Sequence, residues 1–468
     1  MQRDSFYIDN FIPILALYFL LQILLRVFLS PNVGLDEAEQ LLLAQSFEWG
    51  YNAQPPLYTW VQILFFKIFG QNIFALALFK NILLFLTYLF YYKSAQLISK
   101  NRTVALIAAA SLFLIPQISW ESQRALTHSV LLTTVASATF YYILSLKYSI
   151  QKIRYYHYIT LGILFALGFL AKYSFLIYII AITIASLFDK KLKQIIIDKR
   201  IVFTITSFTL LILPHTLWVL EHLSLVTAPT LHKLQPIKGN SFKGVLQFFI
   251  ALIEFLLLMI IPLLLFRKSL TLPSNSFLRT FFWSAAILLI LFMFITGASH
   301  FKDRWLQPYF FLVPLFIATK IDNNRLNIET IKLYFKIIYS LMIIVIGITL
   351  SRLYFPDCFK HPSRLNYPFD TISQKIKKLG FQKGYIIAES KVIGGNMKIN
   401  FPQSIVSAEG FKQPFNGEKS IVIVWKNKFP PQAQKFQKFI KIHQNITLPL
   451  HNSRKTFFTI HIAIIKNF

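Results

Sequence analysis

The residues best suited to catalysis lie together in a short acidic stretch near the N-terminus. Residues 34–40 read GLDEAEQ, directly after the first long apolar run, and no Lys or Arg occurs from Ser30 to Trp60. An acidic loop is unusual in a chain whose formal net charge is +29. Carboxyl groups beside a membrane are costly unless they are paired or used, and a carboxylate can take up a proton in a reaction. We therefore favour a functional role for Asp36.

Helix capping is the alternative interpretation of these acids. Asp36 stands where an N-cap residue would stand, and Glu39 follows three residues later, as in a capping box. The two roles are compatible with each other. The loop continues through QPPLY at residues 54–58, and we expect the partly apolar stretch from Tyr58 to Phe69 to lie along the membrane interface.

A basic and aromatic segment, HFKDRW at residues 300–305, is the next candidate. His300, Lys302 and Arg304 occupy alternate positions, and the following Gln-Pro-Tyr at residues 307–309 predicts a helix that begins at a proline. Such a cluster suits an anionic headgroup held at the membrane surface. A plain aromatic belt with snorkelling cations remains the alternative.

Two further cations are weaker candidates. Arg124 ends the segment WESQR at residues 120–124, and Lys172 lies between Ala171 and Tyr173. Arg124 could snorkel to lipid headgroups, and Lys172 could be an ordinary interfacial lysine at a helix end. Structural and functional interpretations therefore stay open for both.

The composition predicts a membrane protein. Apolar residues make up 55% of 468 positions, the mean hydropathy is +0.54, and runs of roughly twenty apolar residues recur along the chain. The single cysteine, Cys358, excludes an intrachain disulfide and a cysteine-based metal site. We predict an all-α, polytopic bundle of about eleven transmembrane helices. Their predicted spans are 11–29, 73–92, 103–119, 129–146, 158–171, 173–188, 202–221, 245–266, 281–297, 309–320 and 337–351.

The distribution of cations predicts the orientation of the bundle. With a cytoplasmic N-terminus, the loops on the cytoplasmic side hold most of the Lys and Arg between the spans, as the positive-inside rule requires. The acidic loop then faces outward. Much of the net charge is explained by topology and by attraction to anionic lipid, so we predict membrane lipid and no nucleic acid among the partners.

Two regions depart from the simple pattern of long spans. The segment from Tyr158 to Phe188 is too long for one span and too short for two full ones, so we predict two short helices that deliver Lys172 to the outer boundary. Beyond Arg352, alternating runs at residues 385–388 and 420–425 predict strands. We therefore divide the chain into a membrane domain, residues 1–351 with its first outer loop at 30–72, and a small extracytoplasmic α/β domain, residues 352–468.

Four of these features occur in an order that resembles a known family. An Asp-Glu-Ala motif, a Pro-Pro-Leu segment, Gly162 and Gly168 running into Lys172, and the late His-Phe-Lys-Asp-Arg-Trp element are similar to the polyprenyl-phosphate-sugar-dependent glycosyltransferases of the GT-C superfold. The resemblance covers about residues 1–350. It is to the family 39-like branch, which includes protein mannosyltransferases, the lipid A aminoarabinose transferase and the rhizobial core-sugar transferases.

The resemblance implies a GT-C-like fold and a specific reaction. An inverting glycosyltransferase of this family would move a sugar from a polyprenyl-phosphate donor to a hydroxyl of an envelope glycolipid, glycan or protein, at the outer face of a bacterial cytoplasmic membrane. The family's catalytic base maps onto Asp36, and Glu37 matches the second acid of the motif. The like charge of Glu37 is expected to raise the apparent pKa values of the pair. The residues implied to bind the donor phosphate are Lys302, Arg304, His300, Lys172 and Arg124.

Other functions stay open at this point. The outer acids with His128 or His300 could ligate a divalent metal, but no spacing is diagnostic, and we assign no metal or other cofactor. A transporter or flippase of a lipid-linked sugar is the alternative function, although the chain lacks two similar halves with matching interrupted helices. A structural partner in envelope assembly is a third possibility.

Overall fold

The computed structural model describes residues 10–234, 241–271 and 275–466. The chain divides into two compact units, each assembled from segments far apart in the sequence. Unit 1 comprises Met1–Phe19, Glu48–Tyr58 and Ile82–Ile343, and unit 2 comprises Leu20–Phe47, Thr59–Asn81 and Ile344–Phe468. The units reflect packing alone, so the predicted functional boundary at residue 351 stays a prediction.

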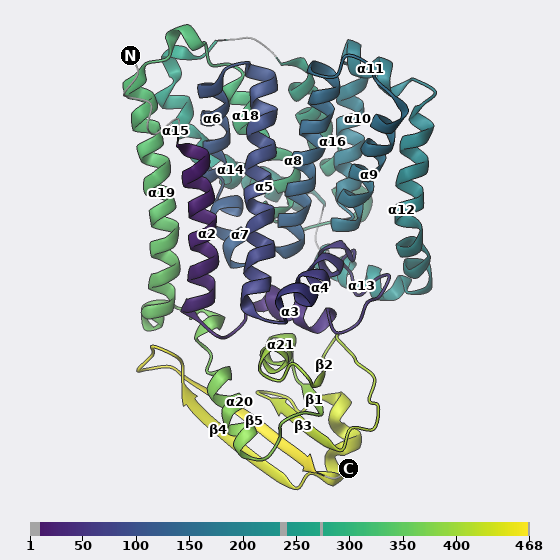
Figure 1. Ribbon diagram of the computed structural model, residues 1–468, viewed down its shortest axis with the longest axis vertical. Coiled ribbons are helices and arrows are strands. Elements are labelled where there is room, and N and C mark those ends of the chain that lie inside the picture. The colour runs from purple at the N-terminus through teal and green to yellow at the C-terminus, as the bar shows by residue number, and fades with distance from the viewer. Residues whose placement is uncertain (1–9, 235–240, 272–274, 467–468) are drawn as a thin grey trace. The chain divides into compact units, whose positions relative to one another are not determined.

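Long apolar helices dominate the part of the chain before residue 355 (Figure 1). Among the described residues, seven helical spans are long and apolar enough to cross a membrane. They are α2 (Phe11–Leu29), α5 (Ile73–Ser99), α8 (Thr127–Tyr148), α12 (Ile201–Glu221), the run Phe242–Leu265 through α14 (Ser241–Leu256) and α15 (Ile260–Leu265), α16 (Ser276–Thr296) and α19 (Ile328–Tyr354). The predicted polytopic membrane class is confirmed, and α2 has the predicted bounds.

The number of spans differs from the predicted eleven. An eighth described span is counted only if a bent pair of segments, Arg102–Leu114 and Gln117–Arg124, crosses as one. The other three predicted spans form helices of 10–17 residues, which are shorter than a full crossing: α9 (Tyr155–Ala171), α10 (Phe175–Leu187) and the run Gln307–Ala318. As predicted, α9 ends at Lys172, which is its C-cap.

Shorter elements connect these helices. They are α3 (Leu35–Leu43), α4 (Leu57–Phe69), α6 (Arg102–Ala110), η1 (Ser111–Leu114), the π-helix η2 (Gln117–Glu121), α7 (Ser122–Arg124), α11 (Lys190–Ile196), α13 (Leu223–Leu234), η3 (Leu257–Met259), η4 (Arg267–Ser269), η5 (Asp303–Trp305), α17 (Gln307–Phe310), α18 (Val313–Ala318), η6 (Asn323–Arg325), η7 (Pro356–Cys358) and η8 (Arg364–Asn366). The predicted proline start of α17 is confirmed.

A proline explains the sharp bend after α6. The two segments of the bent pair meet at 73°. Ile115 is extended, with φ −101° and ψ 104°, because the ring of Pro116 disfavours helical backbone in the preceding residue. The segment after Pro116 then begins as a π-helix. Local sequence thus places residues 117–124 on a separate, short helical piece.

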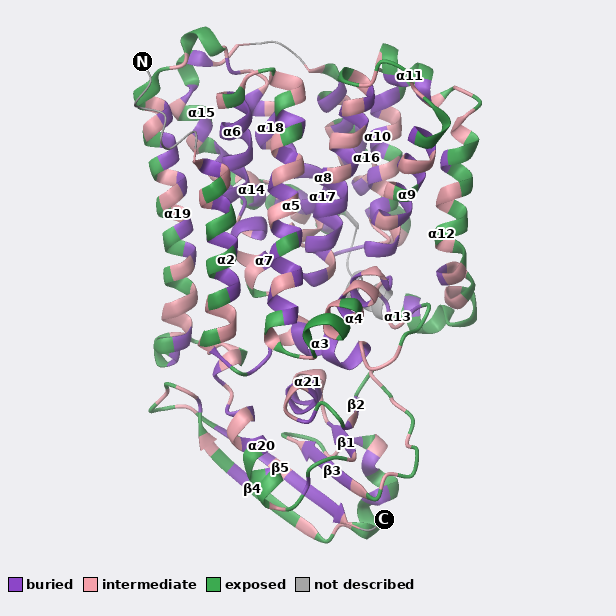
Figure 2. Ribbon diagram, in the orientation of Figure 1, coloured by how far each residue is buried: buried purple, intermediate pink, exposed green. Residues whose placement is uncertain are grey.

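Burial differs strongly among the spans of unit 1. Figure 2 shows α8 buried along most of its length, whereas much of α12 is exposed, with 78% and 11% of their apolar windows buried, respectively. α12 packs on α9 through Gly162, where an added Cβ would lie 2.0 Å from Ser207 Oγ and 2.3 Å from the Thr204 carbonyl oxygen. The two helices can approach this closely only because residue 162 has no side chain.

The C-terminal part of unit 2 is a mixed sheet in the order β2-β1-β3-β5-β4. The strands are β1 (Tyr385–Ala388), β2 (Ile405–Ala408), β3 (Ser420–Trp425), β4 (Ile442–Pro449) and β5 (Phe457–Lys466). β1 and β3 coincide with the two predicted strands, and β1 pairs in parallel with β2 and β3. β5 pairs antiparallel with β3 and β4. The predicted α/β character of this region is confirmed.

Helices cover parts of both faces of this sheet. Helices α20 (Phe369–Lys378) and α21 (Lys391–Asn400) contribute buried side chains to one core, and the 3-10 segment η9 (Pro431–Phe439) contributes to a smaller core on alternate strand positions. Because neighbouring residues of a strand point to opposite faces, the two cores lie on opposite sides of the sheet.

The close contact of α9 with α12 yields a test of the fold. Gly162→Ala should destabilise the protein by about 1–3 kcal/mol, because the new methyl group has to displace the backbone of α12. Thermal unfolding in detergent should show a midpoint lower by a few degrees. Gly347→Ala in α19 is the matched control, since no atom lies within 4 Å of its added Cβ. Equal midpoints for both variants would contradict the proposed packing.

Candidate active site

The acidic loop is built around a buried ion pair between α2 and α3. Arg26 Nε donates to Glu37 Oε1 at 2.8 Å, and Arg26 Nη2 donates to Glu37 Oε2 at 2.7 Å. The same guanidinium donates to the carbonyl oxygens of Ser30 at 3.0 Å and Asn32 at 2.7 Å. A two-pronged pair of this kind fixes both side chains and the loop between them. All of these residues belong to unit 2.

Glu37 also caps α3, in a capping box two residues earlier than the one that the sequence suggested as an alternative. The N-cap is Gly34, and its backbone N–H donates to Glu37 Oε2 at 2.8 Å. The alternative in which Asp36 and Glu39 form the capping box is therefore out of register by two residues, since Glu37 is the acid that binds the N-cap backbone. Asp36 lies in the first turn instead, half-buried, where the helix dipole favours a negative charge.

The expectation that the pKa values of the two acids are raised does not hold for Glu37. Burial raises the pKa of Glu37, but the charge and hydrogen bonds of Arg26 outweigh burial and lower the pKa to about 2. Glu37 is thus a carboxylate whose charge Arg26 neutralises. Its hydrogen bonds to Arg26 and to the backbone of Gly34 position α3. Its predicted catalytic role stays a prediction.

A lysine that the sequence analysis overlooked completes the charge cluster. Lys80 of α5 is 4% exposed and interacts electrostatically with the carboxylates of Asp36 and Glu37. Arg26 and Lys80 are cations inside predicted spans, and an ionisable residue within a span is by default a candidate for function. Both residues could therefore have been identified from the sequence as ionisable residues within spans.

Helix α21 of the same unit holds the other side of α3. The side chain of Asn396 accepts from the Val33 N–H at 2.9 Å and donates to the Val33 carbonyl at 3.1 Å. Lys391 forms an ion pair with Glu39. An added Cβ on Gly395 would lie 2.4 Å from both Cα and Cβ of Ala38, so the two helices touch at these residues. The turn that carries Asp36 is therefore fixed by α2 on one side and by α21 on the other.

A second group of predicted residues gathers in unit 1, around the bent segment after Pro116. Glu121 interacts electrostatically with Arg124, Arg304 and Asp303. Gln117 Nε2 donates to Asp303 Oδ2 at 2.5 Å, and Asp303 Oδ1 accepts from the Arg304 N–H at 2.8 Å. The structure thus brings two of the five predicted phosphate-binding residues, Arg124 and Arg304, into one charge cluster.

The backbone turn after this cluster is strained. Leu126 adopts φ 70° and ψ 37°, the left-handed region, where a branched residue is an outlier. Leu126 is the N-cap of α8, which begins one residue later. Holding a leucine in this conformation costs about 1–3 kcal/mol. The contacts around Leu126 must therefore outweigh this cost.

The remaining predicted cations lie on two neighbouring elements of unit 1. Lys172 Nζ donates to Ser129 Oγ of α8 at 3.1 Å. His300 and Lys302 are partly exposed on the same loop as Arg304. Gln247 of α14 anchors that loop by accepting from the Phe301 N–H at 2.9 Å. The loop thus presents its cations from a fixed backbone.

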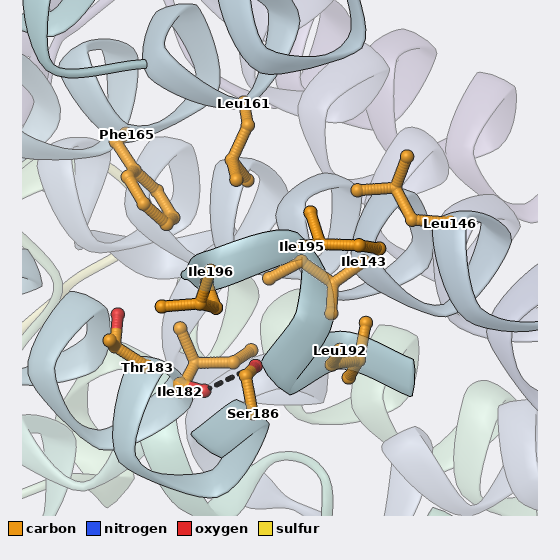
Figure 3. A pocket seen from close by; sticks show the side chains of 10 residues that line it. All are labelled: Ile143, Leu146, Leu161, Phe165, Ile182, Thr183, Ser186, Leu192, Ile195 and Ile196. Carbon is orange, nitrogen blue, oxygen red and sulfur yellow. Dashed lines mark hydrogen bonds between the residues drawn. The ribbon is translucent and has the colours of Figure 1, made fainter. Parts of the chain in front are cut away.

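No metal site is evident among the residues that the structure describes, where no three His, Cys, Asp or Glu side chains lie close enough to hold an ion. The pocket in Figure 3 offers no such chemistry either. It lies in unit 1 among apolar side chains such as Leu161 and Phe165, and its hydroxyls belong to Thr183 and Ser186. Ser186 donates to the Ile182 carbonyl at 2.7 Å. The pocket contains none of the predicted site residues.

Comparisons with known proteins identify relatives for most of the chain. Residues 53–218 match the family model of dolichyl-phosphate-mannose-protein mannosyltransferases. The lipopolysaccharide core galacturonosyltransferase RgtB of Rhizobium johnstonii is 34% identical over 435 residues, which cover 88% of this chain and 86% of RgtB. The lipopolysaccharide core galacturonosyltransferase RgtA of the same organism is 28% identical and covers 89% of this chain and 86% of RgtA.

A solved structure supports the fold assignment. ArnT from Cupriavidus metallidurans, crystallised with undecaprenyl phosphate, superposes with a TM-score of 0.60 over 98% of each chain, at 11% identity. Its apo form superposes with a TM-score of 0.64 over 97% of this chain and 98% of that chain. At this identity the likeness concerns the fold alone.

The contact between α3 and α21 can be tested without any substrate. Gly395→Ala should loosen α3, because the methyl group collides with the backbone of Ala38. Hydrogen–deuterium exchange of the full-length protein should then be faster by about tenfold or more in residues 35–43. Gly394→Ala is the matched control, since its Cβ would meet only side-chain atoms of Ala408 and Leu42, at 3.1–3.4 Å. Unchanged exchange in Gly395→Ala would refute this role of α21.

Proposed function

We propose a reaction for this chain from the chemistry of its family. The chain belongs to the GT-C membrane glycosyltransferases, which match the dolichyl-phosphate-mannose-protein mannosyltransferase model and include the rhizobial core galacturonosyltransferases. The chain is a membrane glycosyltransferase that uses a lipid-phosphate-linked sugar, as its sequence led us to expect. The finer proposal is that it transfers galacturonic acid from a polyprenyl-phosphate donor to the lipopolysaccharide core. The 34% identity to RgtB across 88% of the chain carries this proposal.

The proposed chemistry is a single displacement at the anomeric carbon. An acceptor hydroxyl attacks that carbon, the bond from the carbon to the phosphate oxygen breaks, and the anomeric configuration inverts. Asp36 takes the proton of the acceptor hydroxyl as general base. The buried pair of Arg26 and Glu37 supports this role, because it fixes the first turn of α3. Polyprenyl phosphate leaves as the second product.

The cations of unit 1 are proposed to bind the donor phosphate. Arg304 suits this role because its planar guanidinium can hold two phosphate oxygens at once. Glu121 is proposed to help hold Arg124 and Arg304 in place, since its carboxylate interacts with both cations. Lys302, His300 and Lys172 are proposed to add positive charge as the phosphate departs. We place the reaction at the outer face of the bacterial cytoplasmic membrane, in line with the predicted orientation.

Replacement of the proposed base gives the most direct test. Asp36→Asn keeps the size of the side chain but cannot take a proton, so transfer should fall by about 100-fold or more. The assay is labelled galacturonic acid moved from a polyprenyl-phosphate donor to a rhizobial lipopolysaccharide core acceptor by purified protein. Donor binding should persist. Glu48→Gln, the same exchange at an exposed acid of the same loop, is the control and should retain transfer. Normal turnover by a folded Asp36→Asn protein would rule out the assignment.

A second test concerns the donor phosphate. Arg304→Lys keeps the charge but loses the fork, so transfer should fall by about tenfold, and Arg304→Ala should lose about 100-fold. Both variants should also raise the donor KM. Arg325→Lys, the same exchange at an exposed arginine of η6, serves as the control. If both Arg304 variants match the wild type, residues 300–305 are a membrane-interface belt and not a phosphate site.

A further inference from the structure

One part of the C-terminal sheet lacks a covering element among the described residues. The small core under η9 includes side chains of β1, β3 and the last residues of β5, but none from β4. On that face, the odd-numbered residues of β4 and the first odd-numbered residues of β5 are exposed or half-exposed. Figure 2 shows much of β4 in the colour of exposed residues. We call this surface the open face; it comprises Trp425, His443, Asn445, Thr447, Phe457, Thr459 and His461.

Three aromatic rings lie nearly parallel at one end of the open face. The Trp425 ring lies 5.5 Å from the His443 ring and 5.4 Å from the His461 ring, measured between centroids, and the two histidine rings are 6.3 Å apart. The angles between the ring planes are 0°, 17° and 18°. Phe429 supports Trp425 from the edge at 4.9 Å. The rings thus form a compact, ordered group.

Polar side chains continue the open face beside the rings. Asn445 Oδ1 and His461 Nδ1 are 2.6 Å apart, and the hydroxyls of Thr447 and Thr459 are 2.9 Å apart. Strand pairing places Asn445 opposite His461 and Thr447 opposite Thr459. Phe457, 61% exposed, lies at the far end. The surface therefore offers amide, hydroxyl and imidazole groups between aromatic rings.

This composition differs from that of an ordinary exposed edge hairpin. Edge strands are usually protected by charged side chains, often lysine, yet β4 carries no charged Lys, Arg, Asp or Glu at all. A protein partner would be expected to bury apolar anchors, but the open face has one exposed phenylalanine. Sugars present apolar C–H faces that pack on aromatic rings and hydroxyls that bond to amides and imidazoles. The open face therefore matches a glycan better than a protein.

The charge around the open face indicates an anionic glycan. Residues 352–468 contain 19 Lys and Arg against 5 Asp and Glu, a formal charge of +14. None of β3, β4 and β5 contains an acid, and exposed cations flank them at Lys426, Lys428, Lys441, Arg454 and Lys455. Two acids do reach the flanking loops, but backbone N–H groups of residues 426–428 bind Glu389, and that of Arg454 binds Asp357. A negatively charged ligand would thus meet a positive surround.

We propose that the open face binds an anionic oligosaccharide. In the reaction proposed above, on which this inference rests, that oligosaccharide is the glycan of the acceptor. The aromatic group receives a sugar ring, and the polar pairs of β4 and β5 bind its hydroxyls. The flanking cations attract the carboxylates or phosphates of the glycan. The open face then contributes to acceptor affinity and not to the chemical step.

The experiment measures binding of tetragalacturonate to the full-length protein in detergent by calorimetry, with neutral maltotetraose as the comparison ligand. Thr447→Glu should weaken tetragalacturonate binding by about tenfold, because it places a negative charge on the open face. Gln444→Glu is the matched control: it adds the same charge on the same strand, but an even-numbered position points to the other face. It should change the affinity less than about twofold. Trp425→Ala should weaken binding of the same ligand by about tenfold or more.

The outcomes separate this inference from the proposed reaction. Asp36→Asn should bind tetragalacturonate like the wild type, and Thr447→Glu should raise the acceptor KM while kcat and the donor KM hold. If no galacturonic acid is transferred but the binding pattern appears, the reaction is wrong and the glycan surface stands. Equal losses in Thr447→Glu and Gln444→Glu, equal affinity for maltotetraose, or no binding by the wild type would each overturn the inference.

Discussion

The buried pair of Arg26 and Glu37 is the interaction on which the acidic loop depends. Five hydrogen bonds join these two side chains to each other and to the backbone of residues 30–34. Removing Arg26 would leave the buried carboxylate of Glu37 without its hydrogen-bonded cation, which is destabilising. The pair therefore constrains the first turn of α3, and through it the place and direction of Asp36. Glu37, the second acid of the motif, thus anchors the turn that carries Asp36.

Two arginines of unit 1 also lie beside an acidic side chain. Arg124 and Arg304 both interact with Glu121, and Gln117 binds Asp303. A neighbouring carboxylate favours positions of a guanidinium close to it, and such restriction before a ligand arrives lowers the conformational entropy lost on binding. The proline bend and the left-handed Leu126 bound the short helical segment that carries Glu121 and Arg124. Electrostatics and backbone geometry thus act on the same few residues.

Local patterns in the sequence predicted the elements, and long-range contacts decided the details. Apolar runs and alternating runs predicted α2, β1 and β3 at their observed bounds, because the length and periodicity of an element depend on residues that are close in the sequence. The capping alternative missed the register because GLDEAEQ offers an acid three residues after Gly34 and another three residues after Asp36. Arg26 binds the first of these acids, Glu37. The role of α21 had no local signal, since Asn396 and Val33 are 363 residues apart.

The same distance has a consequence for how the protein is made. The ribosome releases residues 30–45 long before it reaches α21, so at first α3 lacks both the Asn396 partner of the Val33 amide and carbonyl and the Gly395 contact of Ala38. Its final packing forms only when residues 391–400 have been synthesised and folded. A premature stop anywhere before α21 therefore leaves a defect at the opposite end of the chain. Correct packing of the first loop therefore depends on synthesis of the last quarter of the polypeptide.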